Sequence, residues 1–215
     1  MWAMSPTPIR QVLASDERKE HLYAHASRVF AARGFAGTKI ADIAAAAQIS
    51  QGLLYRYFDS KETLFTELIR GSFAKINAAA EALEQLALPA HEKIVLALTR
   101  ITANMESDPA FSERVLLIAQ ASISQGIPAQ TKEVIRAESG KPYETVARIM
   151  ASGQREGTIA AGSPMELATL FWTTIKGLAL HKVAQGESFK APDMHIVARM
   201  FLRQPETQIS TEPTA

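Results

Sequence analysis

Apolar side chains recur at helical spacing along almost the whole chain, and this periodicity limits the possible folds more than any other feature. No segment shows the sustained alternation of apolar and polar residues that a half-buried strand requires. Short breaks that carry Gly, Pro, Ser or Asp divide the pattern into segments of helix length. Gly34 is expected to close a first helix whose apolar stripe includes Leu22 and Ala26. Ser60 and Ser163 are expected to cap later helices. The sequence therefore predicts an all-α protein whose helices bury their apolar stripes against one another.

Composition excludes several classes of protein. With 215 residues, 47% of them hydrophobic, the chain can form one small and one larger packed domain. The absence of cysteine excludes disulfides and thiolate metal sites, and it suits a cytoplasmic location. No run of about 18 apolar residues is present, so no membrane span is expected. Because the net charge is only +1, bulk charge cannot drive nucleic-acid binding, and basic contacts must be local.

The most informative segment contains two short helices joined by a very short connection. An apolar stripe from Ile40 to Ala47 marks the first helix, and residues 48–50 leave room only for a tight turn. Ser50 is expected to cap a second helix that runs through Tyr57. Two short helices with so tight a turn are typical of the helix-turn-helix motif.

Side chains on the second of these helices suit contacts with DNA. Leu54 and Phe58 are expected in the core, which leaves polar and aromatic side chains outward. Gln51 can bond adenine through two hydrogen bonds, and Gly52 lets the backbone approach base edges. Hydroxyl groups, the Lys61 ammonium group and the free amides at helix N-termini can donate hydrogen bonds to phosphates. Thr38 is expected to cap one of these helices. Residues 15–62 are therefore predicted to form a three-helix DNA-binding domain, with contacts from Thr38, Ser50, Gln51, Gly52, Leu53, Tyr55, Arg56, Tyr57 and Lys61.

The segment from Thr38 to Leu64, TKIADIAAAAQISQGLLYRYFDSKETL, resembles the signature of the tetracycline-repressor (TetR) family. The run Gly-x-Leu-Tyr-x-Tyr-Phe-x-Ser-Lys-Glu carries most of the likeness. Gln48 departs from the family pattern, which often has glycine in the turn, and a non-glycine restricts the backbone there. The resemblance implies a homodimeric regulator, commonly a repressor, which a ligand entering the C-terminal body releases from a double-stranded DNA operator.

Residues 63–204 are expected to form a larger effector-binding and dimerisation domain, with five or six further helices over residues 72–204. The helix that follows Ser163 is apolar nearly all round between Leu167 and Leu180, so it must be buried on more than one side. It is expected to pair with a last helix near Pro192–Arg203 and with both helices of a second copy, although the central helix of a monomer is an alternative. Two recognition helices would then read a pseudo-palindromic operator. The predicted interface residues are Leu167, Leu170, Thr174, Gly177, Leu178, Ile196 and Met200.

The family resemblance implies a small-molecule effector, and the apolar character of its expected pocket favours a hydrophobic or aromatic one. Trp172 and His181 are favoured because polar-edged groups on an apolar helix can orient a ligand. Each candidate could instead be an ordinary core residue. The predicted effector contacts are Asn104, Met105, Gln120, Tyr143, Met150, Phe171, Trp172 and His181, and no cofactor is expected.

An enzyme is the first competing class. No cysteine nucleophile, Gly-rich phosphate loop or Gly-x-Ser-x-Gly elbow is present, and no histidine follows a glutamate by three residues, as a di-iron bundle requires. Glu17, His21 and His25 share one helical face, and a solvated polar face is favoured there over a metal site.

Two further classes compete with an effector-controlled regulator. One is a DNA-binding regulator without an effector, and the other is a helical-bundle module for protein interactions. The second leaves the outward Gln51 and Tyr55 unexplained, and a core role for the tyrosines would need a helix that is apolar on every face. Residues 1–14 are expected to form a flexible arm and residues 205–215 a disordered tail.

Overall fold

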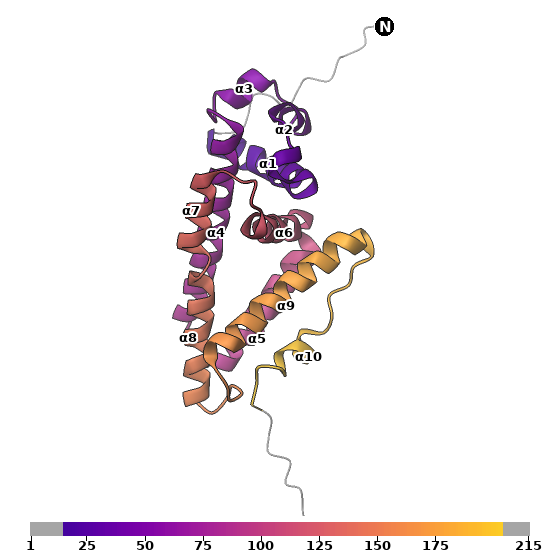
Figure 1. Cartoon of the computed structure of the whole chain (residues 1–215). Helices are drawn as coiled ribbons and strands as arrows, with labels where there is room; N and C mark the ends of the chain where they lie inside the picture. The colour runs from indigo at the N-terminus through magenta and orange to yellow at the C-terminus, as the bar shows by residue number, and fades with distance from the viewer. Residues whose placement is uncertain (1–14, 204–215) are drawn as a thin grey trace, which may run out of the picture. The chain divides into compact units, whose positions relative to one another are not determined.

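The computed structural model describes residues 15–203 and is built from helices, with no strand in that range (Figure 1). This confirms the all-α prediction. The predicted arm over 1–14 and the predicted tail over 205–215 lie outside the described residues. The chain divides into two compact units, which we call the first and the second unit.

The first unit contains the chain up to Phe73 together with Ala110–Ala137. The long helix α4 begins in this unit and ends in the second one. The helices of the first unit are α1 (Ser15–Gly37), α2 (Ile40–Ala46), α3 (Gln51–Tyr55), the start of α4 (Lys61–Gln85), α6 (Pro109–Ile123) and α7 (Ala129–Glu138).

The second unit contains Ala74–Pro109 and the chain from Glu138 onward. Its helices are the end of α4, α5 (Ala90–Ser107), α8 (Lys141–Arg155), α9 (Pro164–Gln185), the short 3-10 helix η1 (Gly186–Ser188) and α10 (Met194–Ala198). Six α-helices and one short 3-10 helix therefore follow α4 among the described residues, and the number of α-helices agrees with the sequence prediction.

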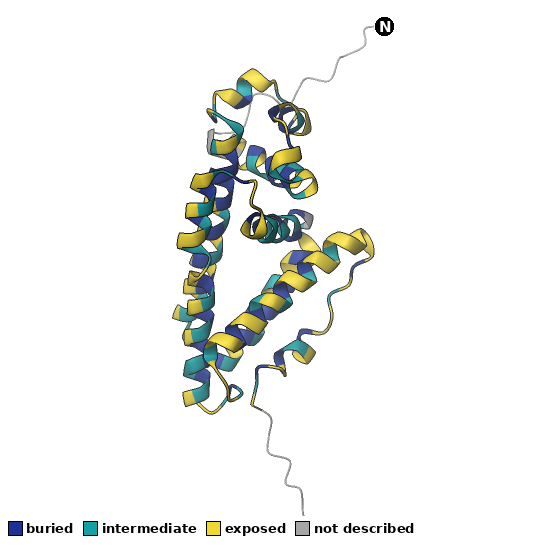
Figure 2. Cartoon of the chain, in the orientation of Figure 1, coloured by how far each residue is buried: buried dark blue, intermediate teal, exposed yellow. Residues whose placement is uncertain are grey.

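The core of the first unit is aromatic where α1 meets α4. The ring of Phe30 lies edge-on to Phe65, with 4.8 Å between the centroids, and Phe35 packs on Phe65 at 5.0 Å. Leu22 and Ala26 of the predicted α1 stripe are buried as well (Figure 2). Phe30 and Phe65 are buried, and their contact stabilises the packing of α1 against α4.

The helix boundaries follow the predicted signals at several positions. Gly34 has a φ of 67° and interrupts α1, as expected for a glycine that ends a helix. Ser60 accepts a hydrogen bond from the amide of Thr63 at 3.0 Å at the start of α4. Ser163 accepts one from the amide of Glu166 at 3.4 Å, which confirms the predicted cap of α9.

Three predictions about helix ends are wrong. The helix capped by Ser50 does not run through Tyr57, because α3 ends at Tyr55. Thr38 does not cap α2, because that helix starts at Ile40 with Lys39 as its N-cap. The last helix does not extend over Pro192–Arg203, because α10 spans five residues, Met194–Ala198.

Tertiary contacts explain why α10 is so short. Beyond it the backbone turns and bonds to the connection between α8 and α9: the Ala160 amide donates to the Phe201 carbonyl at 2.8 Å, and the Arg203 amide to the Thr158 carbonyl at 3.0 Å. Phe201 is fully buried and its ring lies 6.1 Å from that of Phe171. Burying this ring and pairing the backbone takes the place of further helical turns.

Candidate nucleic-acid interface

A tight turn at Gln48 sets the angle between α2 and α3. Gln48 has a φ of 55°, in the left-handed region that glycine adopts most easily. The amide of Ile49 donates back to the carbonyl of Ala44 at 2.9 Å, which closes the end of α2. Ser50 then caps α3, because its hydroxyl accepts a hydrogen bond from the amide of Leu53 at 3.2 Å.

The short helix α3 has one buried and one exposed face. Leu54 and the following Phe58 are buried in the first unit, as predicted. The opposite face is open to solvent and half of the Tyr55 side chain is exposed. The predicted contacts Gln51, Gly52, Tyr55 and Arg56 are exposed, whereas Leu53 and Tyr57 are half-buried.

Gly52 has no side chain, which leaves space on this exposed face of α3. Among the described residues, no atom of another element lies within 4 Å of the position that its Cβ would occupy. The backbone of α3 can therefore come close to a flat partner such as a base pair at this point.

Lys61 and Thr38 have internal partners. The Lys61 ammonium donates to the carbonyls of Phe35 and Thr38, both at 3.0 Å, and lies 4.2 Å from the centre of the Phe35 ring. Thr38 is buried and its hydroxyl donates to the Gly34 carbonyl at 2.7 Å. These two residues tie the start of α4 to the turn before α2, so they position the motif.

Lys39 is a surface residue of the motif that the sequence analysis did not select. It is exposed and forms the N-cap of α2, where its amide donates to the Asp42 carboxylate at 2.9 Å. This hydrogen bond from the Lys39 amide and the neighbouring Arg33 guanidinium, 2.9 Å from the Asp42 carboxylate, hold the pKa of Asp42 below its ordinary value. Asp42, three positions after Lys39, could have identified Lys39 as the N-cap from the sequence, because an acidic residue at that spacing often accepts a hydrogen bond from the N-cap amide.

A half-buried tyrosine of α1 connects this helix to α4. The Tyr23 hydroxyl donates to the Glu67 carboxylate at 2.8 Å, and its ring lies 5.6 Å from that of Phe58. Burial and the Glu67 carboxylate raise the pKa of Tyr23, so the hydroxyl keeps its proton. Burial raises the pKa of Glu67, but the bonds from Tyr23 and Lys19 outweigh this effect and leave it lowered.

The predicted effector residues lie in different environments. Met105, Met150 and Phe171 are buried, Gln120, Tyr143 and Trp172 are half-buried, and Asn104 and His181 are exposed. Gln120 belongs to the first unit and the others to the second.

The structure brings three of these residues together where α8 meets α9. The Trp172 ring lies 5.3 Å from Phe171 and 6.1 Å from Tyr143, and its Nε1 donates to the Pro142 carbonyl at 3.1 Å. Lys176, which the sequence analysis did not select, donates to the Tyr143 hydroxyl at 2.7 Å.

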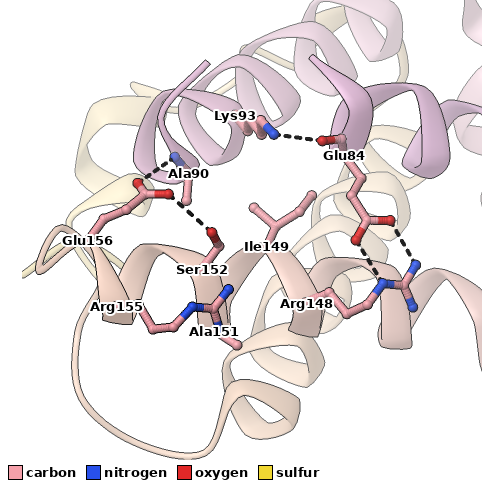
Figure 3. A pocket seen from close by; sticks show the side chains of 9 residues that line it. All are labelled: Glu84, Ala90, Lys93, Arg148, Ile149, Ala151, Ser152, Arg155 and Glu156. Atoms are coloured by element: carbon pink, nitrogen blue, oxygen red, sulfur yellow. Dashed lines mark hydrogen bonds and ion pairs between the residues drawn. The ribbon is translucent and has the colours of Figure 1, made fainter. Parts of the chain in front are cut away.

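One pocket of about 430 Å³ lies where α4, α5 and α8 meet in the second unit (Figure 3). Arg148 binds the Glu84 carboxylate through two bonds of 2.7 and 2.8 Å, and the Ala90 amide donates to Glu156 at 3.0 Å. None of the predicted effector residues lines this pocket. Its lining is charged, which differs from the apolar cavity expected for the effector.

Many residues of α9 and α10 in the second unit are exposed (Figure 2), and several of those on α9 are large and apolar. Among the predicted interface residues, Leu170, Gly177, Ile196 and Met200 are exposed, whereas Thr174 and Leu178 are half-buried. Leu167 is buried inside the protomer, so it is not available to a partner. The exposed large apolar side chains of this region are Met165, Leu170, Leu180 and Val183 on α9, Ile196 on α10 and Met200 just after α10, with exposed fractions of 41–57%.

Comparison with known proteins identifies the family. Residues 22–68 match the model for bacterial regulatory proteins of the tetR family. The transcriptional repressor NicS of Pseudomonas putida is 30% identical over 144 residues, which are 66% of each chain. The chain belongs to the TetR family. The repressor KstR2 of Rhodococcus jostii is 41% identical over 68 residues, 32% of this chain and 33% of that relative.

Solved structures of transcriptional regulators share the fold of this TetR-family regulator. The MbdR regulator from Azoarcus sp. CIB superposes with a TM-score of 0.72 at 21% identity, over 85% of this chain and 95% of that one. A regulator from Saccharomonospora viridis in complex with choline gives 0.67 at 19% identity, over 88% and 100%. Within residues 15–203, no helix combines the length and the apolar character needed to cross a bilayer.

Proposed function

We propose that this TetR-family regulator is a homodimeric cytoplasmic repressor that acts without catalysis. In this proposal it reads a pseudo-palindromic operator with α3 and leaves the operator when a small molecule binds. The exposed polar face of α3, held by buried Leu54 and Phe58 behind a tight turn, carries the proposal. A face of this kind suits the major groove, where side-chain amides can distinguish base pairs.

The residues of α3 divide into two proposed roles. Gln51, Gly52 and Leu53 lie in its first turn, where they can approach base edges and a thymine methyl group. Tyr55, Arg56 and Tyr57 follow and would bond phosphates, which fix the register without reading sequence. Lys39 at the exposed start of α2 is proposed as a phosphate contact, whereas Thr38 and Lys61 are proposed as positioning residues.

The proposed dimer uses the exposed apolar residues of α9, with Ile196 of α10 and Met200, just after α10, at its edge. Leu170, Thr174 and Gly177 lie on one face of α9 at the i, i+4, i+7 spacing. Among the described residues, no atom of another element lies within 4 Å of the Cβ position of Gly177, so a second helix could cross closely there. Such a contact would remove these side chains from water, which drives association.

Effector control is proposed from apolar packing and from regulators of similar fold. The second unit buries Phe171 and Phe201, and Met105 and Met150 are also fully buried. Similar structures include a regulator solved with choline and FadR from Bacillus subtilis solved with stearoyl-CoA. An apolar or aromatic ligand that enters this unit would change the separation of the two recognition helices and release DNA.

Binding to genomic DNA fragments tests the proposal. The wild-type protein should select a pseudo-palindromic duplex, and its affinity should fall steeply as salt rises, because phosphate contacts release counterions. Gln51→Ala should change the preference at one base position, whereas Tyr55→Ala should weaken binding to all sequences. Gln130→Ala, which removes an exposed glutamine of α7, is the matched control and should bind like wild type. Failure to retain any fragment above non-specific levels at moderate salt would contradict the proposal.

A further inference from the structure

His21 and His25 form a close pair on α1, and the DNA-binding proposal uses neither of them. Their Nε2 atoms are 3.2 Å apart and their ring centroids 4.4 Å apart. The two residues are one helical turn apart, so both rings project from the same side of the helix. His21 is exposed and His25 is half-buried, so solutes can reach the pair from solvent.

The separation of the two nitrogens matches that of two ligands on one metal ion. Zinc binds imidazole nitrogen at about 2.0–2.1 Å, and tetrahedral coordination places two such nitrogens about 3.3 Å apart. The observed 3.2 Å is close to this value, so the two nitrogens lie at a separation that one ion can bridge. We propose that His21 and His25 form a chelating site for a divalent transition metal such as Zn²⁺ or Ni²⁺.

The surroundings of the pair support an exchangeable site. Leu22 and Ala26, next to the histidines in sequence, are buried and fix this turn of α1. The nearby Arg28 pairs with the Glu113 carboxylate at 3.4 Å, which partly neutralises a charge that would repel a cation. Among the described residues, no group of three or more potential metal-binding side chains is found, so water would fill the remaining positions. A site with two protein ligands binds more weakly than a structural zinc site with four.

A metal at this site would stabilise the DNA-binding unit. An ion bound to both rings would bridge one turn of α1, whose opposite side packs in the core with Phe30 and Phe65. A ligand that binds only the folded chain raises its stability as the ligand concentration rises. The stability of the first unit would then depend on the free metal concentration.

Calorimetric titration of Zn²⁺ into the untagged full chain tests the proposal. At about pH 7.5 imidazole is mostly neutral and can donate its lone pair to a metal. The wild-type chain should bind one ion per chain, and His21→Ala or His25→Ala should abolish that binding. The chain has five histidines, and His181→Ala and His195→Ala remove exposed ones on α9 and α10. These two controls should bind zinc as wild type does.

Thermal unfolding gives a second measurement. Zinc should raise the melting temperature of the wild-type chain and of both controls, but not that of His25→Ala. His25→Gln, which keeps a polar side chain without the imidazole, serves if the alanine variant does not fold. Absence of zinc binding to the wild-type chain would overturn the proposal, and so would equal binding to the double variant His21→Ala/His25→Ala. The second result would leave the pair as a hydrogen bond between two imidazoles.

Discussion

At the scale of single residues, the backbone of Gln48 limits the helix-turn-helix most directly. Its φ of 55° costs an L-residue about 1 kcal/mol relative to the right-handed region, and glycine avoids this cost. We therefore predict that Gln48→Gly raises the free energy of unfolding by about 0.5 kcal/mol, after the extra entropy of glycine in the unfolded chain is subtracted. Urea denaturation measures the change. Gln48→Ala keeps the Cβ and should give no such gain, and a less stable glycine variant would contradict the prediction.

At Gly153 of α8, the limit is the space for a side chain and not the backbone conformation. A Cβ at this position would collide with the Ile159 side chain and would lie 3.0 Å from the Cβ of Ala90. We predict that Gly153→Ala lowers the free energy of unfolding by about 1–3 kcal/mol, the usual cost of overpacking a core. Gly71→Ala, at an exposed position of α4, is the matched control, since no atom of another element among the described residues lies within 4 Å of its Cβ position. That control should stabilise by about 0.5–1 kcal/mol, and equal effects of both substitutions would refute the steric explanation.

At the scale of elements, the two lysines that flank the helix-turn-helix, at the start of α2 and at the start of α4, are expected to differ in role. Lys61 bonds two carbonyls inside the first unit, whereas Lys39 is exposed at the N-cap of α2. We predict that Lys61→Met lowers the free energy of unfolding by about 1–2 kcal/mol, because bonds to a charged donor are lost. Lys39→Met should leave stability within about 0.5 kcal/mol of wild type, since it is a surface substitution.

DNA binding separates the two roles further. Lys39→Met should weaken binding to every sequence and reduce the salt dependence by about one phosphate contact. Lys61→Met should keep the salt dependence of wild type, because its ammonium already has internal partners. Denaturation together with filter binding at several salt concentrations measures both properties. An unchanged stability for Lys61→Met would contradict the positioning role.

At the scale of the whole molecule, the exposed apolar face of α9 is the feature that a monomer explains least. Leu170 and Leu180 expose 47% and 55% of their surface. We predict that Leu170→Glu combined with Leu180→Glu converts the proposed dimer into a monomer, because two charges would be buried at the contact. Sedimentation at micromolar concentration measures the change. Leu88→Glu, at another exposed leucine of the second unit, should remain dimeric, and a dimeric double variant would exclude α9 as the interface.

The sequence alone determined the local features of this regulator. The apolar stripe beginning at Ile40 and the caps Ser50, Ser60 and Ser163 predicted helix positions, because capping and helical periodicity depend on residues a few positions apart. The same local pattern predicted that α3 buries Leu54 and exposes Gln51. The family resemblance rested on this region too.

Tertiary structure decided what distant residues do to one another. Lys61 looked like a phosphate contact in sequence, and only the fold brings it to carbonyls 23 and 26 positions earlier. The short α10 depends on burial of Phe201 and on backbone bonds to the connection after α8. Gly153 needs no side chain because Ile159 and Ala90 approach it from elsewhere in the chain. Periodicity carries no information on such contacts, because they arise when elements distant in sequence are packed together.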